Sequence, residues 1–145
     1  MKRYLTLCYL FFPFLAFAQL DTTVYHIAEE MPIVCACSYI TDKAEQRQCS
    51  DKKIFETIYK HFKTPRGKHE DFKVICGRFV VAYIVEIDGS ISNIRIVRSC
   101  EVEVFDNAII KAIEAFPQFI PAKQNGKPIP VEIIFPITLH YEYSD

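Results

Sequence analysis

The chain has 145 residues and a mass of 16.8 kDa, a length that favours a single domain. Half of its residues are apolar, 24% are charged and only four are glycine, which argues against a disordered or fibrous chain. The 17 basic and 18 acidic residues give a net charge of -1, and the sequence has no strongly basic stretch. A nucleic-acid partner is therefore not expected.

The first 18 residues have the pattern of a secretory signal peptide. Lys2 and Arg3 precede an apolar run that ends in the small-x-small tripeptide Ala16-Phe17-Ala18. This run contains Pro13 and is shorter than the about 20 residues that a transmembrane helix needs. We expect an exported chain that is cleaved after Ala18, with an uncleaved membrane anchor as the alternative.

Export changes the expected state of the cysteines, because an oxidising compartment favours disulfides over metal ligands. Cleavage would leave five of them: Cys35, Cys37, Cys49, Cys76 and Cys100. A bond between Cys35 and Cys37 would be strained, so we expect one of the two to bond Cys49. The odd number leaves at least one thiol free or bonded to another chain. A copper or zinc site of Cys35, Cys37 and His26 is the less favoured alternative, and no metal is expected.

The first predicted helix begins at a cap on Ser50 or Asp51, whose side-chain oxygens can accept from the amides of a first turn. Its apolar positions recur at helical spacing from Ile54 to Phe62, and Pro65 follows its end. Val34 to Gln48 is expected to be an irregular, disulfide-stapled loop.

A β-hairpin is predicted next. Val74 to Ile87 and Ile91 to about Cys100 are rich in strand-forming residues, and Asp88-Gly89 between them is a strong turn dipeptide. With these two residues as the loop, Cys76 and Cys100 are one residue out of register. A bulge or a three-residue loop would bring them within reach of a disulfide.

The remaining sequence predicts one more helix, a loop and a strand. Phe105 to Phe116 carries an apolar stripe at helical spacing, and Pro117 ends the helix. Phe119 to Pro130 is expected to be a loop around Asn125-Gly126. Val131 to Tyr141 is predicted to be the last strand.

Pro136 lies inside this last strand, and because it cannot donate to a ladder it indicates a sheet edge or a bulge. The order helix, strand, strand, helix, strand predicts an α+β fold, in which a three-stranded antiparallel sheet has two helices packed on one face.

Several of these segments together resemble the TonB C-terminal domain, over roughly residues 72 to 142. A lead-in of Val24-Tyr25 and Glu29-Glu30-Met31-Pro32 is similar to that of Bacteroidetes-type members. The segments that carry the main resemblance are Gly77-Arg78-Phe79-Val80-Val81-Ala82-Tyr83-Ile84-Val85, Asp88-Gly89-Ser90-Ile91, Phe105-Asp106-Asn107-Ala108-Ile109, Phe116-Pro117, and Phe119-x-Pro121-x-Lys123-x-x-Gly126-Lys127-Pro128.

The resemblance implies a periplasmic domain that contacts outer-membrane transporters for iron chelates, vitamin B12 or glycans, with energy from inner-membrane motor proteins. A short transporter peptide, the TonB box, would add as a strand beside the last strand of the domain. An exposed sheet edge suits this mode, because its amide and carbonyl groups lack partners. The residues that correspond to the peptide-binding strand are Val131, Glu132, Ile133, Ile134, Phe135, Ile137 and Leu139.

The expected organisation is a signal peptide over residues 1–18, a cysteine-containing segment over residues 19–50 and a TonB C-terminal-like domain over residues 51–145. Typical transducers have a membrane anchor and a long proline-rich segment, which this sequence does not show. The alternative function is therefore a free periplasmic interaction or structural module without a motor, including a homodimer that swaps Val131 to Tyr141. The sequence has no phosphate-binding loop, HExxH motif or nucleophile elbow, so neither an enzyme nor a cofactor is expected.

Overall fold

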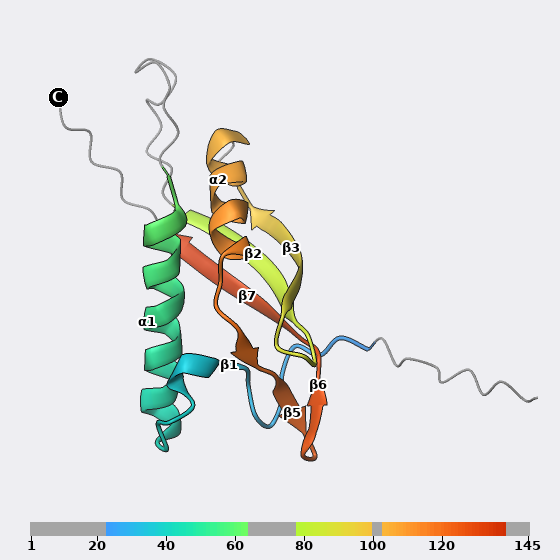
Figure 1. The fold of residues 1–145 in the computed structure, drawn as a ribbon. Helices are drawn as coiled ribbons and strands as arrows, with labels where there is room; N and C mark the ends of the chain where they lie inside the picture. Colours follow the sequence, from blue (N-terminus) through green and yellow to red (C-terminus); the bar gives the residue numbers. More distant parts are fainter. Residues whose placement is uncertain (1–22, 64–77, 100–102, 139–145) are drawn as a thin grey trace, which may run out of the picture.

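The structure is a computed structural model, and it describes residues 23–63, 78–99 and 103–138. The predicted signal peptide, Cys76, Cys100 and Leu139 lie outside the described residues. The elements follow the order β1, a short 3-10 helix η1, α1, β2, β3, α2, β4, β5, β6 and β7 (Figure 1). No helix in the described ranges is long and apolar enough to cross a membrane.

Helix α1 spans Lys43–His61, and its N-cap lies eight residues before Ser50, the first of the two predicted caps. The Asp42 carboxylate accepts from the amides of Ala44 and Glu45 at 2.9 Å each, so Asp42 is the N-cap. The prediction of an irregular loop up to Gln48 was therefore wrong from Lys43 onwards. The signal was present, because Asp42 and Glu45 have the spacing of a capping box.

Strands β2 (Arg78–Val85) and β3 (Ile91–Arg98) form the predicted antiparallel hairpin. Its loop has three residues, one of the two lengths that the sequence left open, and the Glu86 amide closes it by donating to the Ser90 carbonyl at 2.9 Å. Gly89 ends the loop with a φ of 80°, a conformation that favours glycine.

Helix α2 (Glu103–Glu114) confirms the second predicted helix, but the expected loop after it contains three short strands. Strand β4 (Phe119–Ile120) pairs with β1 (Ile33–Val34). Strands β5 (Ala122–Gln124) and β6 (Lys127–Ile129) form a small hairpin. Asn125 and Gly126 connect them with φ angles of 50° and 73°, as a tight two-residue hairpin turn requires.

The main sheet has the order β3-β2-β7, and all of its strands are antiparallel. Strand β7 spans Val131–Thr138 and lies at one edge. Both helices cover the same face of this sheet (Figure 1), where the rings of Phe62 and Phe105 stack with centroids 6.2 Å apart. The predicted α+β architecture is therefore confirmed.

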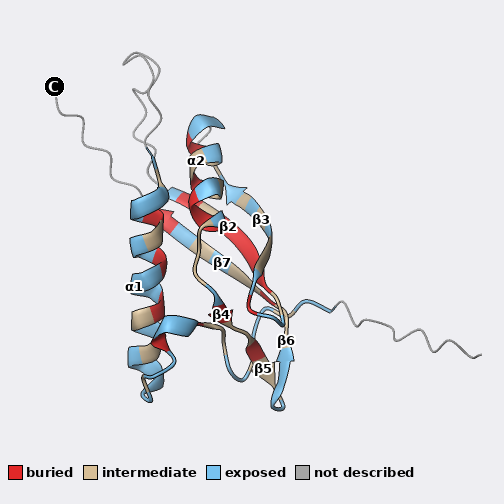
Figure 2. Cartoon of the chain, viewed as in Figure 1, coloured by how far each residue is buried: buried red, intermediate tan, exposed pale blue. Residues whose placement is uncertain are grey.

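The hydrophobic core lies between this face and the two helices. Figure 2 shows that burial is concentrated on the central strand β2 and on the inner faces of the helices. The largest fully buried side chains are Tyr83, Phe79, Ile58, Ile109, Ile113 and Ile137. Because β2 lies between β3 and β7, strand β7 is an edge strand that pairs along its whole length with β2.

Candidate peptide-binding edge

Strand β7 pairs with β2 in one continuous register of eight residue pairs, from Val131↔Val85 to Thr138↔Arg78. Its side chains alternate between the two faces of the sheet. Ile133, Phe135 and Ile137 contact the core below the helices. Glu132, Ile134, Pro136 and Thr138 lie on the opposite face, where the Ile134 side chain is 58% exposed.

The β-bridge between Tyr25 and Val131 identifies the backbone groups of β7 that point away from β2. The Tyr25 amide donates to the Pro130 carbonyl at 3.1 Å, and the Glu132 amide donates to the Tyr25 carbonyl at 2.8 Å. Because backbone groups alternate sides along a strand, Ile134, Pro136 and Thr138 also point outward. Within the described ranges, Tyr25 is the one residue that pairs with this edge, and it does so at Val131.

Pro136 is suited to its outward position. At this place the missing N–H removes no bond to β2, so the ladder continues past it to Thr138. Among the described residues, none pairs with the outward amides of Ile134 and Thr138 or with the outward carbonyl of Pro136, which a further strand could use. The edge position that Pro136 indicated in the sequence is the one observed.

The opposite edge of the sheet is less regular. The pairing of β3 with β2 shifts register twice, between Val80 and Val81 and between Ala82 and Ile84. Asn93 of β3 has a φ of 47°. Bulges of this kind twist an edge and interrupt its row of donors and acceptors, so they disfavour strand addition. Strand β7 is thus the edge better suited to bind an extended peptide.

The Glu132 side chain contacts two other polar side chains on the face of the sheet opposite the helices. The Glu132 carboxylate is 2.5 Å from the Arg95 guanidinium and 3.4 Å from Nδ1 of His26. Because His26 follows Tyr25, this contact also holds residues 23–34, named here the N-terminal strap, against the beginning of β7.

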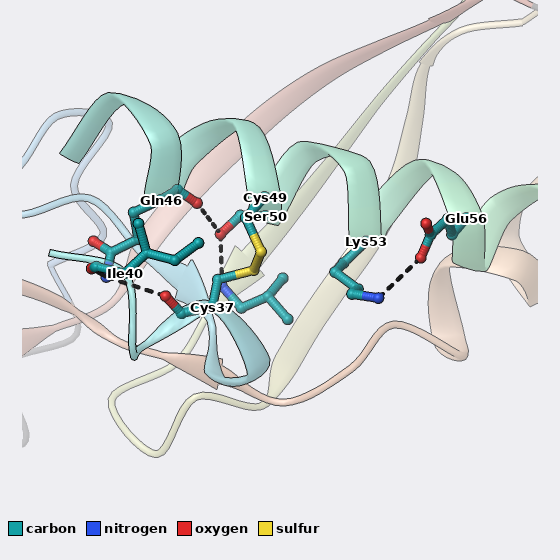
Figure 3. The surroundings of a disulfide bond; sticks show 8 residues. Cys37, Ile40, Gln46, Cys49, Ser50, Lys53 and Glu56 are labelled. Atoms are coloured by element: carbon teal, nitrogen blue, oxygen red, sulfur yellow. Dashed lines mark hydrogen bonds and ion pairs between the residues drawn. A yellow bond between two sulfur atoms is a disulfide. The ribbon is translucent and has the colours of Figure 1, made fainter. Parts of the chain in front are cut away.

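A disulfide attaches η1 (Cys35–Cys37), which directly follows the strap, to α1. Cys37 bonds Cys49, with the two Cα atoms 6.0 Å apart (Figure 3). Cys35 is an exposed free thiol. Of the two pairings that the sequence left open, the structure therefore has the one through Cys37. Since the Cys37 sulfur is in the disulfide, it cannot serve as a ligand in the alternative metal site with Cys35 and His26. The described residues contain no cluster suited to a metal ion.

A cavity of about 410 Å³ lies between the strap, α1 and β7. Its floor is apolar and includes Ile54, Tyr83, Phe119, Ile133 and Phe135. Lys43, Arg47 and Asp51 line it from α1, one turn of the helix apart.

Two titratable groups at this cavity are perturbed by burial. Burial raises the pKa of the Asp51 carboxyl, and the nearby Arg47 charge opposes the shift. Burial also raises the pKa of the Tyr83 phenol, with a smaller contribution from the Asp51 carboxylate. Tyr83 is therefore a neutral phenol at physiological pH.

Sequence reasoning identified β7 and its edge position but missed the cavity and the strap. The capping pattern of Asp42 and Glu45 could have extended α1 and placed Lys43 and Arg47 on a helix. The bridge from Tyr25 to Val131 spans more than a hundred residues and has no local signal.

Comparisons with known proteins found similar solved structures and a matching family model. Two NMR solution structures of the Helicobacter pylori TonB C-terminal domain are similar to the chain. One is 22% identical, with 64% of this chain and 81% of that chain covered and a TM-score of 0.45. The other is 24% identical, with 61% and 89% covered and a TM-score of 0.46.

No curated protein matches the chain. Residues 72–140 match the family model described as Gram-negative bacterial TonB protein C-terminal. This match includes β2, β3, α2 and β4 to β7, and so the whole of the three-stranded sheet. The resemblance predicted from the sequence is therefore confirmed over residues 72–140, which match the TonB C-terminal domain family.

Proposed function

We propose that this chain is a periplasmic TonB-like protein of energy-coupled transport, and that it binds an extended peptide of an outer-membrane transporter by strand addition at β7. The observation that carries the proposal is the regular edge of β7, which the described residues pair only at Val131, in a domain that matches the TonB C-terminal family. A strand added there would gain backbone hydrogen bonds without any change in the sheet.

The part of the β7 edge that is available to a peptide is short, because the strap covers its beginning. Because Tyr25 already occupies the groups at Pro130 and Glu132, the peptide would pair with the outward groups of Ile134, Pro136 and Thr138. The Ile134 amide is the first free donor of this row. Its loss should weaken binding without disturbing the bonds between β7 and β2, which point the other way.

The test is the substitution Ile134→Pro, with Ile134→Thr as the matched control. Both remove the exposed isoleucine side chain, but only proline removes the outward N–H. The probes are synthetic peptides from the periplasmic ends of the TonB-dependent transporters of the same organism, and binding is measured by fluorescence anisotropy.

We expect Ile134→Pro to abolish capture and Ile134→Thr to keep it within about threefold, because one exposed side chain contributes little. Far-UV circular dichroism should be the same for both variants. Undiminished binding by a folded Ile134→Pro protein would place the peptide elsewhere and contradict the proposal.

A further inference from the structure

A buried tyrosine hydroxyl faces the cavity between the strap, α1 and β7. Tyr83 of the central strand β2 is 1% exposed and lines this cavity. No described residue forms a hydrogen bond with its hydroxyl, although buried tyrosine hydroxyls usually have a partner. Every fully buried side-chain N or O atom of the described residues does have a partner. The Tyr83 hydroxyl is therefore not sealed in the core but lies on the wall of the cavity.

Two neighbouring rings fix the direction of this phenol. Phe116 meets the Tyr83 ring edge to face with centroids 5.6 Å apart, and Phe119 lies on it at 6.4 Å. Side chains in such a close-packed core keep one rotamer, so the hydroxyl stays at the cavity. Burial raises the pKa of the phenol, with a smaller contribution from Asp51, and the group therefore remains a hydrogen-bond donor at physiological pH.

Most of the cavity is built by parts of the chain outside the family match. The strap lines it with residues 28–33, and α1 lines it between Lys43 and Ile54. The Val34 amide donates to Ser50 Oγ at 3.1 Å and so fixes the strap to α1. The volume of about 410 Å³ is within the range of about 300–1,000 Å³ that ligand pockets occupy. The cavity is therefore a preformed feature that this chain adds to the TonB-like sheet.

The charged residues of the lining have both signs and lie at its solvent side. They are Lys43, Arg47, Glu29, Glu30 and Asp51, and all five are exposed. The Glu29 carboxylate accepts from Gln124 Nε2 and from the Asn125 amide, and Arg47 interacts electrostatically with Asp51. Such a lining selects neither an anion nor a cation, so an uncharged ligand fits it best.

The interior of the cavity offers apolar surface and two kinds of hydrogen-bonding group. Ile54 and Phe119 of the floor are buried, and Phe135 is half-buried. The Tyr83 hydroxyl can donate, and the Asp51 carboxylate, which interacts electrostatically with this phenol, can accept. A purely apolar ligand would leave the hydroxyl without a partner.

We propose that the cavity binds an uncharged small molecule that has an apolar body and an amide group. The apolar body lies on the floor of Ile54, Phe119 and Phe135. The amide oxygen accepts from the Tyr83 hydroxyl, and the amide N–H donates to the Asp51 carboxylate. This site does not require a strand at the β7 edge.

The test uses planar probes that differ in one group. Benzamide is uncharged and carries the amide, whereas benzoate and benzamidinium have the same shape with a negative or a positive charge. Toluene supplies the apolar ring alone. Each is titrated into the ¹⁵N-labelled chain and followed by amide chemical shifts. The variants are Tyr83→Phe and the control Tyr59→Phe, which changes an exposed tyrosine of α1 outside the lining.

Benzamide should shift the amides of Ile54, Tyr83 and Phe135 and bind about three- to tenfold more tightly than benzoate or benzamidinium. Tyr83→Phe should weaken benzamide about three- to tenfold and leave toluene unchanged, because only the amide uses the hydroxyl. Tyr59→Phe should change neither affinity. The urea midpoint of Tyr83→Phe should not fall, since no group of the protein loses a hydrogen bond.

Tighter or equal binding of benzoate or benzamidinium would overturn the amide site. An unchanged benzamide affinity in Tyr83→Phe would do so too, as would the absence of any shift at the cavity, which is the result for a cavity filled by water alone. A lower urea midpoint of Tyr83→Phe would show that the hydroxyl has a partner within the protein. Capture of transporter peptides is decided separately by Ile134→Pro.

Discussion

Two glycines at turns have a similar left-handed backbone conformation but different surroundings. Gly89 and Gly126 have φ angles of 80° and 73°. A Cβ atom on Gly89 would lie 1.9 Å from the Phe119 carbonyl oxygen, whereas on Gly126 it would meet nothing within 4 Å. The Phe119 amide also donates to the Gly89 carbonyl at 3.0 Å, so the β2–β3 turn is packed directly against β4.

We therefore expect Gly126→Ala to lower the free energy of unfolding by about 1 kcal/mol, the ordinary cost of a left-handed alanine. Gly89→Ala should lower it by about 3 kcal/mol or more, because the turn must move away from β4. Urea denaturation of the two variants measures the difference. Equal losses would show that the close contact between Gly89 and Phe119 is absent in solution.

Ser50 is the one polar side chain that is buried among the described residues, and it joins the strap to α1. Its hydroxyl accepts from the Val34 amide at 3.1 Å and donates to the Gln46 carbonyl at 3.0 Å. Ser50→Ala should cost about 1–3 kcal/mol, because it leaves a buried amide without a partner. Thr57→Ala, which removes an exposed hydroxyl on the same helix, is the control and should change the urea midpoint little.

At the scale of elements, the disulfide contributes the largest single constraint on the N-terminal part of the chain. The fully buried Cys37 in η1 is bonded to Cys49 in α1 and closes a short loop, with a sequence separation of 12. Cys49→Ser should lower stability by about 2–4 kcal/mol, mainly through the greater entropy of the unfolded chain.

Cys35→Ser is the matched control for this prediction, because Cys35 is exposed and free. It should leave the urea midpoint unchanged, and the reductant dependence of unfolding should be lost only in Cys49→Ser. A reductant-sensitive Cys49→Ser protein would instead indicate that another cysteine pair carries the constraint.

Elements with a strong periodic pattern were the ones that the sequence predicted well. The hairpin, α2 and β7 were recognised because their apolar residues repeat at strand or helix spacing. The beginning of α1 was missed, because its first two turns are polar and only the cap at Asp42 indicates them. Strands β4 to β6 were missed because they have two or three residues each, too few to show a period.

At the scale of the whole molecule, the features that the sequence did not predict depend on contacts between segments far apart in the chain. The strap reaches the beginning of β7 through Tyr25, the β5 strand through Glu30 and β4 through Ile33, and none of these contacts has a local pattern. These contacts both shorten the free edge of β7 and build the cavity next to it. The proposed signal peptide and the Cys76–Cys100 bond stay predictions.

The central claim is that a transporter peptide adds as a strand along β7. It is tested most directly by amide hydrogen exchange of the folded chain with and without a bound transporter peptide. We expect new protection at the outward amides of Ile134 and Thr138 and no change along β3. Protection along β3 instead, or binding with no protection at Ile134 and Thr138, would contradict the account.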